Sequence, residues 1–165
     1  MSATPEPRSA IATMREAMEA GEPDRASDAF APDVIVRSPI TSSFEFRGRD
    51  QVRDLLRDVV AALGPSHYVE EIGEGDTRVL LARVVVGGQE INEAIVTRLR
   101  PDGLIAEMTL YVRPLPGLTT MAARIGPRVA GHRGRWRRVV LTAMLAPLAF
   151  ASRRGEVVAA KIASP

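Results

Sequence analysis

The sequence predicts an α+β fold in which helices come first and a curled antiparallel sheet follows. Apolar residues recur at helical spacing over much of the first 63 residues. Between residues 66 and 113 the period changes to two, and Gly and Pro mark the turns. Because helices and strands are grouped rather than interleaved, the pattern is typical of α+β rather than alternating α/β proteins.

The first part of the chain predicts three helices and one strand. The helical segments are residues 9–20, 24–30 and 48–64, and the strand is residues 34–36. In the first helix Ile11, Met14 and Met18 share one apolar face, and Gly21 supplies a stop. The strand ends at Pro39, which lacks the N–H group that a continuing ladder needs.

The middle of the chain predicts four further strands. They are residues 68–72, 78–86, 89–99 and 104–112. Gly87-Gly88 is a two-residue hairpin signal, and Pro101-Asp102-Gly103 marks a tight turn. The last three strands should therefore form an antiparallel meander.

Charge and composition divide the chain into two units, 1–113 and a basic helical extension, 114–165. The extension carries nine of the 22 basic residues and one of the 20 acidic residues. We expect PLPGL to be a linker, followed by helices at 119–130 and 135–152, the second bent or ended by Pro147.

Three interpretations of the basic extension are open. It could lie on an anionic membrane and insert Trp136 and the apolar run VVLTAMLAPLAF, it could bind nucleic acid, or it could fold back on the net-acidic first unit as a lid. We favour the lid over membrane contact, because the extension sums to +8 and the rest of the chain to −6, so that each is the electrostatic partner of the other. We expect no nucleic-acid binding, because Trp136 is not accompanied by interleaved aromatic residues. The lid should bury Val140, Met144, Leu145 and Leu148 and pair its arginines with Glu70, Glu71 and Glu74.

Several classes of chemistry are excluded by composition. The chain has no Cys, which removes disulfides, thiolate nucleophiles and Cys-ligated zinc. Neither His67 nor His132 has a second ligand at metal-binding spacing, and the GxSxG motif is absent, so we expect no metal, no cofactor and no serine hydrolase. No leader peptide or bilayer-spanning apolar run is recognisable, which predicts a cytoplasmic protein.

Four segments together resemble the nuclear-transport-factor-2-like (NTF2-like) superfamily with its cystatin-like fold, and in particular its SnoaL-like branch. They are the helix ending EAGEPD, the strand FAPDVIVRSP, the helix start FRGRDQVRDLL and the hairpin TRLRPDGLIAEMTLYV. The resemblance covers residues 9–113. It implies a conical barrel with a hydrophobic pocket at its mouth and a homodimer formed through the outer face of the sheet.

The SnoaL-like branch includes ketosteroid isomerases and polyketide cyclases, but the catalytic residues of the isomerases are missing from this chain. The catalytic Asp position holds Ser38, the oxyanion-hole Tyr position holds Met14, and the oxyanion-hole Asp position falls near Ile95. Ketosteroid isomerisation is therefore rejected, and whether the chain is an enzyme stays open.

The remaining candidate for catalysis is Glu93. Alternation places it on the pocket face of its strand, where burial would raise its pKa and make it a general base. The alternatives are a solvated Glu93 or an acid-base pair with His67. The predicted ligand-binding residues are mainly apolar: Met14, Met18, Ser38, Ile95, Thr97, Met108, Leu110 and Val112.

The sequence thus predicts a protein that binds, and could transform, a small hydrophobic molecule of polyketide, steroid or terpenoid type. The alternative is a ligand-sensing or dimerisation scaffold without chemistry, or a peripheral membrane protein through its basic tail.

Overall fold

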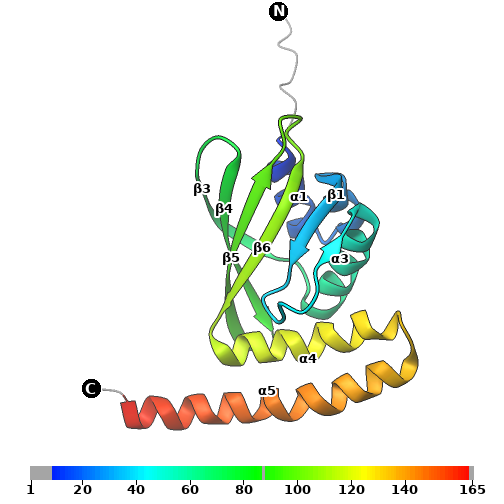
Figure 1. Ribbon diagram of the computed structural model, residues 1–165. Helices are drawn as coiled ribbons and strands as arrows, with labels where there is room; N and C mark the ends of the chain where they lie inside the picture. The colour runs from blue at the N-terminus through cyan, green and yellow to red at the C-terminus, as the bar shows by residue number, and fades with distance from the viewer. Residues whose placement is uncertain (1–8, 87, 164–165) are drawn as a thin grey trace, which may run out of the picture.

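The structure is a computed structural model that describes residues 9–86 and 88–163, and it has the predicted α+β fold (Figure 1). The elements are α1 (Ala10–Ala20), α2 (Pro23–Ser27), β1 (Phe30–Arg37), β2 (Phe46–Arg47), α3 (Arg49–Leu63), β3 (His67–Ile72), β4 (Thr77–Val86), β5 (Gln89–Leu99), β6 (Ile105–Arg113), α4 (Leu115–Gly131) and α5 (Arg135–Ala163).

The six strands form one sheet in the order β2-β1-β6-β5-β4-β3. Strands β3 to β6 are the predicted antiparallel series, and β4 pairs with β5 along its whole length. The sheet is mixed rather than purely antiparallel, because β1 runs parallel to β6, with Val36 opposite Met108. Local sequence signals do not encode the direction of a pairing between strands so far apart in the chain.

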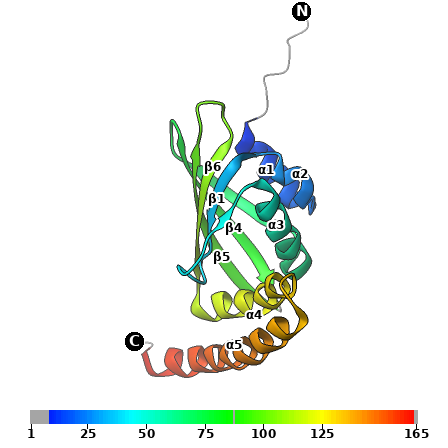
Figure 2. The same cartoon turned by 45° about the vertical axis from the view of Figure 1, so that its right-hand side comes forward.

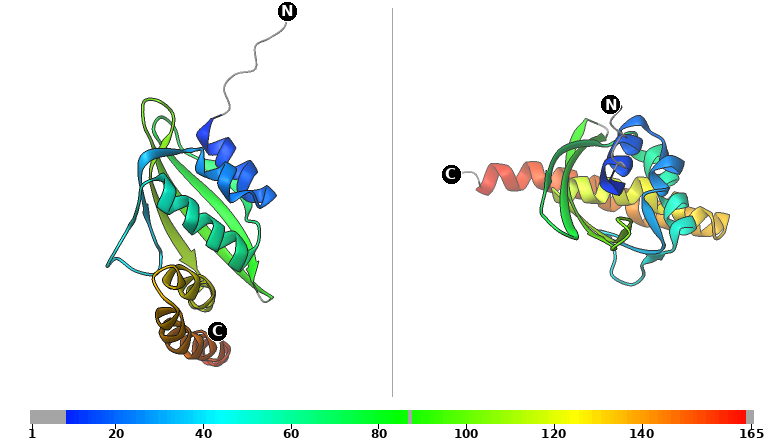
Figure 3. Two further views of the ribbon diagram at one scale, coloured as in Figure 1. Left: turned by 90° about the vertical axis from the view of Figure 1, so that its right-hand side faces the viewer. Right: turned by 90° about the horizontal axis from the view of Figure 1, so that it is seen from above.

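The sheet curls around α1, α2 and α3 without closing into a barrel (Figures 2 and 3). Ile11 and Met14 of α1 and Val52 of α3 are buried against Val34 and Leu80 of the sheet. Each fully buried aliphatic side chain of this kind stabilises the fold by about 1.5–3 kcal/mol.

The turns follow the predicted chemistry. Gly21 ends α1 with φ 71°, a left-handed conformation that suits Gly, and Ser9 begins α1 by accepting a hydrogen bond from the Ala12 N–H at 3.1 Å. At the β5–β6 turn the Asp102 carboxylate accepts from the Leu104 N–H at 3.0 Å. Of the predicted Gly-Gly hairpin, Gly88 has φ 78° and Gly87 lies outside the described residues.

Helix α4 closes the wide end of the curled sheet, below β4, β5 and α3 (Figures 1 and 2). Its residues Met121 and Ile125 are buried with Val84, Val86 and Ile91 in a second core cluster. The expectation that PLPGL is a linker is wrong, because Pro114 is the N-cap of α4 and the next four residues form its first turn. Proline is tolerated there, since the first N–H groups of a helix have no intrahelical partner.

Helix α5 packs mainly on α4, on the side away from the sheet (Figure 1). It continues through Pro147 to Ala163, well beyond the predicted end at residue 152. The prediction that the second C-terminal helix is the lid is therefore wrong. Helix α4 closes the end of the sheet instead, and Val140, Met144 and Leu148 of α5 are exposed.

The predicted partners of the α5 arginines are also different. Glu71 pairs with Arg15 at 3.1 Å and with Arg78 at 3.6 Å. Across the described residues, no ion pair joins α5 to Glu70, Glu71 or Glu74. None of the helices in this part of the chain is both long and apolar enough to cross a membrane.

Candidate functional site

A cleft of about 500 Å³ lies between the segment 38–45, which joins β1 to β2, and the last residues of β6. Three predicted ligand-binding residues line it: Ser38, Leu110 and Val112. The cleft exists because the pairing of β1 with β6 ends at Arg37 opposite Thr109. Beyond that pair the chain turns away from β6 and leaves a gap beside the strand.

Hydrogen bonds hold the turn that forms the cleft wall. The Ser38 hydroxyl accepts from the Ile40 N–H at 3.1 Å. The Arg37 guanidinium donates to Glu45 at 2.9 Å and to Glu107 of β6 at 2.7 Å, which ties the loop to the sheet. The hydrogen bond from Arg37 holds the pKa of Glu107 below its ordinary value, so both partners stay charged near neutral pH.

Glu93 points to the inner face of the sheet, as the alternation predicts, and is 8% exposed. The register places it opposite Val112 on one side and Ala82 on the other. Burial raises the pKa of its carboxyl group from 4.5 to about 7, because the charged form loses water that the surrounding side chains do not replace. Glu93 can therefore exist in both protonation states near neutral pH.

Tyr68 of β3 extends the same row across the sheet. It lies opposite Ala82, whose small side chain separates Tyr68 from Glu93. Burial, followed by the nearby charge of Glu93, raises the pKa of the Tyr68 hydroxyl, so this group stays protonated. Sequence reasoning missed Tyr68, although it is the single aromatic residue on the inward face of the HYVEEI strand.

The other predicted ligand-binding residues are inside the core rather than in the cleft. Met14, Met18, Ile95 and Met108 are all buried in the main core cluster. Thr97 is fully buried and donates a hydrogen bond to the Arg78 carbonyl at 3.1 Å. These side chains thus pack in the interior between sheet and helices, and the cleft lies beside the last residues of β6.

A dyad of His67 with Glu93 does not form. His67 is exposed and adjoins the buried Tyr68, so it points to the opposite face of the sheet from Glu93. Within the described part of the chain, the Glu93 carboxylate has no hydrogen-bonding side chain or ion-pair partner. Nor do three His, Asp or Glu residues gather there as a metal site requires.

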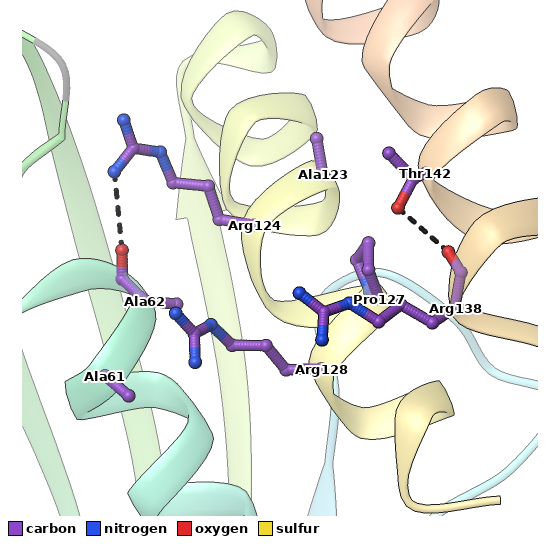
Figure 4. Close-up of a pocket in the computed structure, with 8 residues that line it drawn as sticks. All are labelled: Ala61, Ala62, Ala123, Arg124, Pro127, Arg128, Arg138 and Thr142. Carbon is purple, nitrogen blue, oxygen red and sulfur yellow. Dashed lines mark hydrogen bonds between the residues drawn. The ribbon is translucent and has the colours of Figure 1, made fainter. Parts of the chain in front are cut away.

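A second cavity of about 350 Å³ lies where α3, α4 and α5 meet (Figure 4). Arg124 and Arg128 of α4 and Arg138 of α5 line it, and no carboxylate does. Arg124 donates to the Ala62 carbonyl at the end of α3, at a long 3.4 Å. The three arginines give this side of the molecule a concentrated positive charge.

Residues 11–108, more than half of the chain, match the family described as the SnoaL-like domain. The chain belongs to the SnoaL-like domain family. The matched region ends before α4, so both C-terminal helices lie outside it. No curated protein sequence matches the chain significantly.

Solved structures support the same fold for this SnoaL-like protein. An uncharacterised bacterial protein with a cystatin-like fold from Silicibacter pomeroyi is 24% identical, with a TM-score of 0.67 over 72% of this chain and 84% of that chain. A steroid delta-isomerase from Pseudomonas aeruginosa is 24% identical, with a TM-score of 0.66 over 79% of this chain and 98% of that chain. An NTF2-like protein of unknown function from Burkholderia xenovorans is 20% identical, with a TM-score of 0.56 over 62% and 79%.

Proposed function

We propose that the protein binds a small, mainly apolar molecule in the cleft beside β6. We further propose that the ligand reaches Glu93, a buried titratable group that does not line the cleft but is paired with the lining residue Val112. The observation that carries this proposal is the cleft of about 500 Å³ lined by Leu110 and Val112, with the buried Glu93 paired across from Val112. That volume is within the range of small-molecule sites, which combine apolar walls with a few polar groups.

The ligand class follows from the polar inventory of the cleft. Arg37 and Glu45, which pair with each other, are the charged groups of the lining. Hydroxyl groups come from Ser38, Thr41, Ser42, Thr109 and Tyr111, and apolar contacts from Pro39, Ile40, Phe44, Leu110 and Val112. A molecule of polyketide, steroid or terpenoid type has a matching character, with a large apolar skeleton and few oxygen atoms. The steroid delta-isomerase with the same fold accords with this class at the level of architecture alone.

Glu93 could add chemistry to binding. With a pKa of about 7 it can accept a proton from the ligand or donate one to a carbonyl oxygen at neutral pH. Tyr68, which stays protonated, is the neighbouring hydroxyl on the same face. Turnover is only the second part of the proposal, because Ser38, Met14 and Ile95 occupy the positions where ketosteroid isomerases have their catalytic groups.

The competing function is a scaffold that uses its surfaces and no ligand. It is favoured by the side chains of Met14, Met18 and Met108, which fill the interior. The homodimer expected through the outer face of the sheet belongs here, because Val85 and Tyr111 are exposed on that face. Light scattering after size-exclusion chromatography measures whether such a dimer forms.

Binding is tested with N-phenyl-1-naphthylamine, an uncharged apolar fluorophore whose emission rises in apolar sites. We expect saturable binding that Leu110→Trp and Val112→Phe weaken at least ten-fold, because both variants fill the cleft. Val69→Trp, at an exposed position of β3, is the matched control and should bind as the wild type does. Binding that neither cleft variant weakens would refute the assignment of the cleft.

The role of Glu93 is tested separately by the pH dependence of the same binding. If only the neutral carboxyl group tolerates an apolar ligand, the Kd should rise about ten-fold between pH 6 and pH 8, as expected for a group of pKa about 7. Glu93→Gln should remove this dependence and keep tight binding at pH 8. Binding that depends on the cleft but not on pH would support the cleft as the binding site and contradict a role for Glu93 in it.

A further inference from the structure

Helix α5 has an apolar surface that the described residues do not cover. Six of its large apolar side chains are 59–80% exposed: Trp136, Val139, Met144, Phe150, Val157 and Ile162. A monomeric protein rarely exposes so much apolar surface on one element, and such surfaces usually mark an interaction site.

The opposite face of α5 explains how the helix is held. Leu145 lies against Gly126 of α4, Ala149 is buried, and the Ser152 hydroxyl is 2.6 Å from that of Thr119. These positions recur every three or four residues and therefore form one stripe. The six exposed side chains are not part of this stripe, and α5 as a whole lies on the side of α4 away from the sheet (Figures 1 and 3).

Positive charge lies at the start of the exposed face and again between Phe150 and Val157. Arg135 and Arg137 begin the helix, Arg153 and Arg154 follow the uncharged stretch 139–152, and Glu156 is the single acid between residues 114 and 165. Arg137 lies over the Trp136 ring at 5.4 Å, and Arg154 lies over the Phe150 ring at 4.8 Å. Within the described residues, no ion pair neutralises these arginines.

We propose that α5 lies flat on the surface of an anionic lipid bilayer, with its outer apolar face in the acyl-chain boundary and its arginines at the lipid phosphates. An interfacial helix combines these two features, a continuous apolar face and basic residues beside it. Its aromatic residues suit the boundary, since Trp has an apolar ring and a polar N–H group.

A second copy of the chain is a poorer occupant of the same face. In an antiparallel pair of α5 helices, Arg135 and Arg137 of one copy would approach Arg153 and Arg154 of the other. In a parallel pair each arginine would approach its own counterpart. Glu156 is a single acid beside these cations, so like-charge repulsion opposes both arrangements. An anionic surface instead attracts the arginines.

Vesicle binding of the full chain tests the proposal, and Trp136 reports it because it is the only Trp in the sequence. With vesicles of 70% phosphatidylcholine and 30% phosphatidylglycerol, we expect flotation with the lipid and a blue shift of Trp136 emission. Vesicles of phosphatidylcholine alone should bind at least ten-fold more weakly, and 0.5 M NaCl should reduce binding to the anionic vesicles. Absence of binding to the anionic vesicles overturns the proposal.

The apolar contribution is tested by Phe150→Gln with Val157→Gln. This double variant should lower the partition coefficient at least ten-fold while the protein keeps its melting temperature. The matched control replaces two apolar residues of similar exposure on β3, Val69→Gln with Ile72→Gln, and should change it less than two-fold. If the Phe150 and Val157 double variant instead abolishes a concentration-dependent dimer and no vesicle binding occurs, α5 is a self-association surface and the proposal fails.

The electrostatic contribution is tested by Arg135→Gln with Arg137→Gln. Binding should fall at least ten-fold on anionic vesicles and become less sensitive to salt, because two phosphate contacts are lost. The matched control removes two exposed arginines of the sheet, Arg83→Gln with Arg98→Gln, and leaves the total charge equal. An equal loss in both pairs would show that net charge rather than α5 attracts the protein, which contradicts the proposal.

Discussion

Replacing Glu93 by Gln should stabilise the protein at alkaline pH and have little effect at acid pH. The folded protein holds the Glu93 pKa at about 7, whereas the unfolded chain has the ordinary value of 4.5. A raised carboxyl pKa contributes stability that is fully present below pH 4.5 and is lost as pH rises through 7. At 1.36 kcal/mol for each pH unit between the two values, the loss is about 3 kcal/mol. Gln has the same shape and no charge, so it avoids this loss.

Urea unfolding at several pH values between 4.5 and 8 measures the effect. The free energies of unfolding of wild type and Glu93→Gln should be nearly equal at the acid end. At pH 8 the variant should be about 3 kcal/mol more stable, which moves the urea midpoint by about 1.5 M for a slope near 2 kcal/mol per M. Glu90→Gln, at an exposed position of the same strand, should show no such pH-dependent gain.

A constant difference between wild type and Glu93→Gln across this pH range would refute the reasoning. It would mean that Glu93 ionises in the folded protein as readily as in the unfolded chain. The carboxylate would then reach water, and the general-base role in the proposed function would be lost with it.

Three other outcomes are expected. Arg37→Met should weaken fluorophore binding several-fold in titrations, because Arg37 joins Glu45 of the cleft wall to Glu107 of β6. Arg47→Met should not weaken it, because Arg47 pairs with Glu45 of the wall and makes no ion pair with β6 among the described residues. Equal effects would contradict this account of the cleft. Leu80→Ala, at a fully buried position, should cost about 2–5 kcal/mol in urea unfolding, and a cost below 1 kcal/mol would contradict the core assignment. Deleting residues 114–165 should destabilise the protein by several kcal/mol and raise anilinonaphthalene sulfonate binding, whereas deleting residues 135–165 should leave α4 on the core and have clearly smaller effects on both. If both truncations behave alike, α4 does not close the core.

The inward set of the meander was predictable from the sequence because it depends on local alternation. Glu93, Ile95 and Thr97 are all buried and their neighbours in the strand are more exposed, as a period of two requires. Alternation likewise predicted that Leu110 and Val112 face inward, and the observed register places them opposite Ile95 and Glu93. Two lining residues of the cleft and the buried acid were therefore accessible without a structure.

The parts that could not be predicted depend on long-range packing. Nothing in FAPDVIVR indicates that β1 joins β6 in parallel, and the cleft follows from where that pairing ends at Arg37. PLPGL suggested a linker and Pro147 a bend or an end of the last helix, but Pro116 lies in the first turn of α4 and α5 continues through Pro147. A helix can absorb a proline in its first turn or where packing compensates the lost hydrogen bond, and only the tertiary structure supplies that information.

The position of α4 limits the routes by which a ligand could reach Glu93. In this chain the wide end of the curled sheet is closed by Met121 and Ile125, which are buried against Val86 and Ile91. A molecule approaching from that end would have to displace a packed helix, at a cost of several kcal/mol in lost burial. The cleft beside β6 requires no such displacement, because its wall is a loop held by partly exposed hydrogen bonds from Arg37. In the proposed function, the C-terminal extension, which lies outside the SnoaL-like region, therefore determines which side of that region the ligand uses.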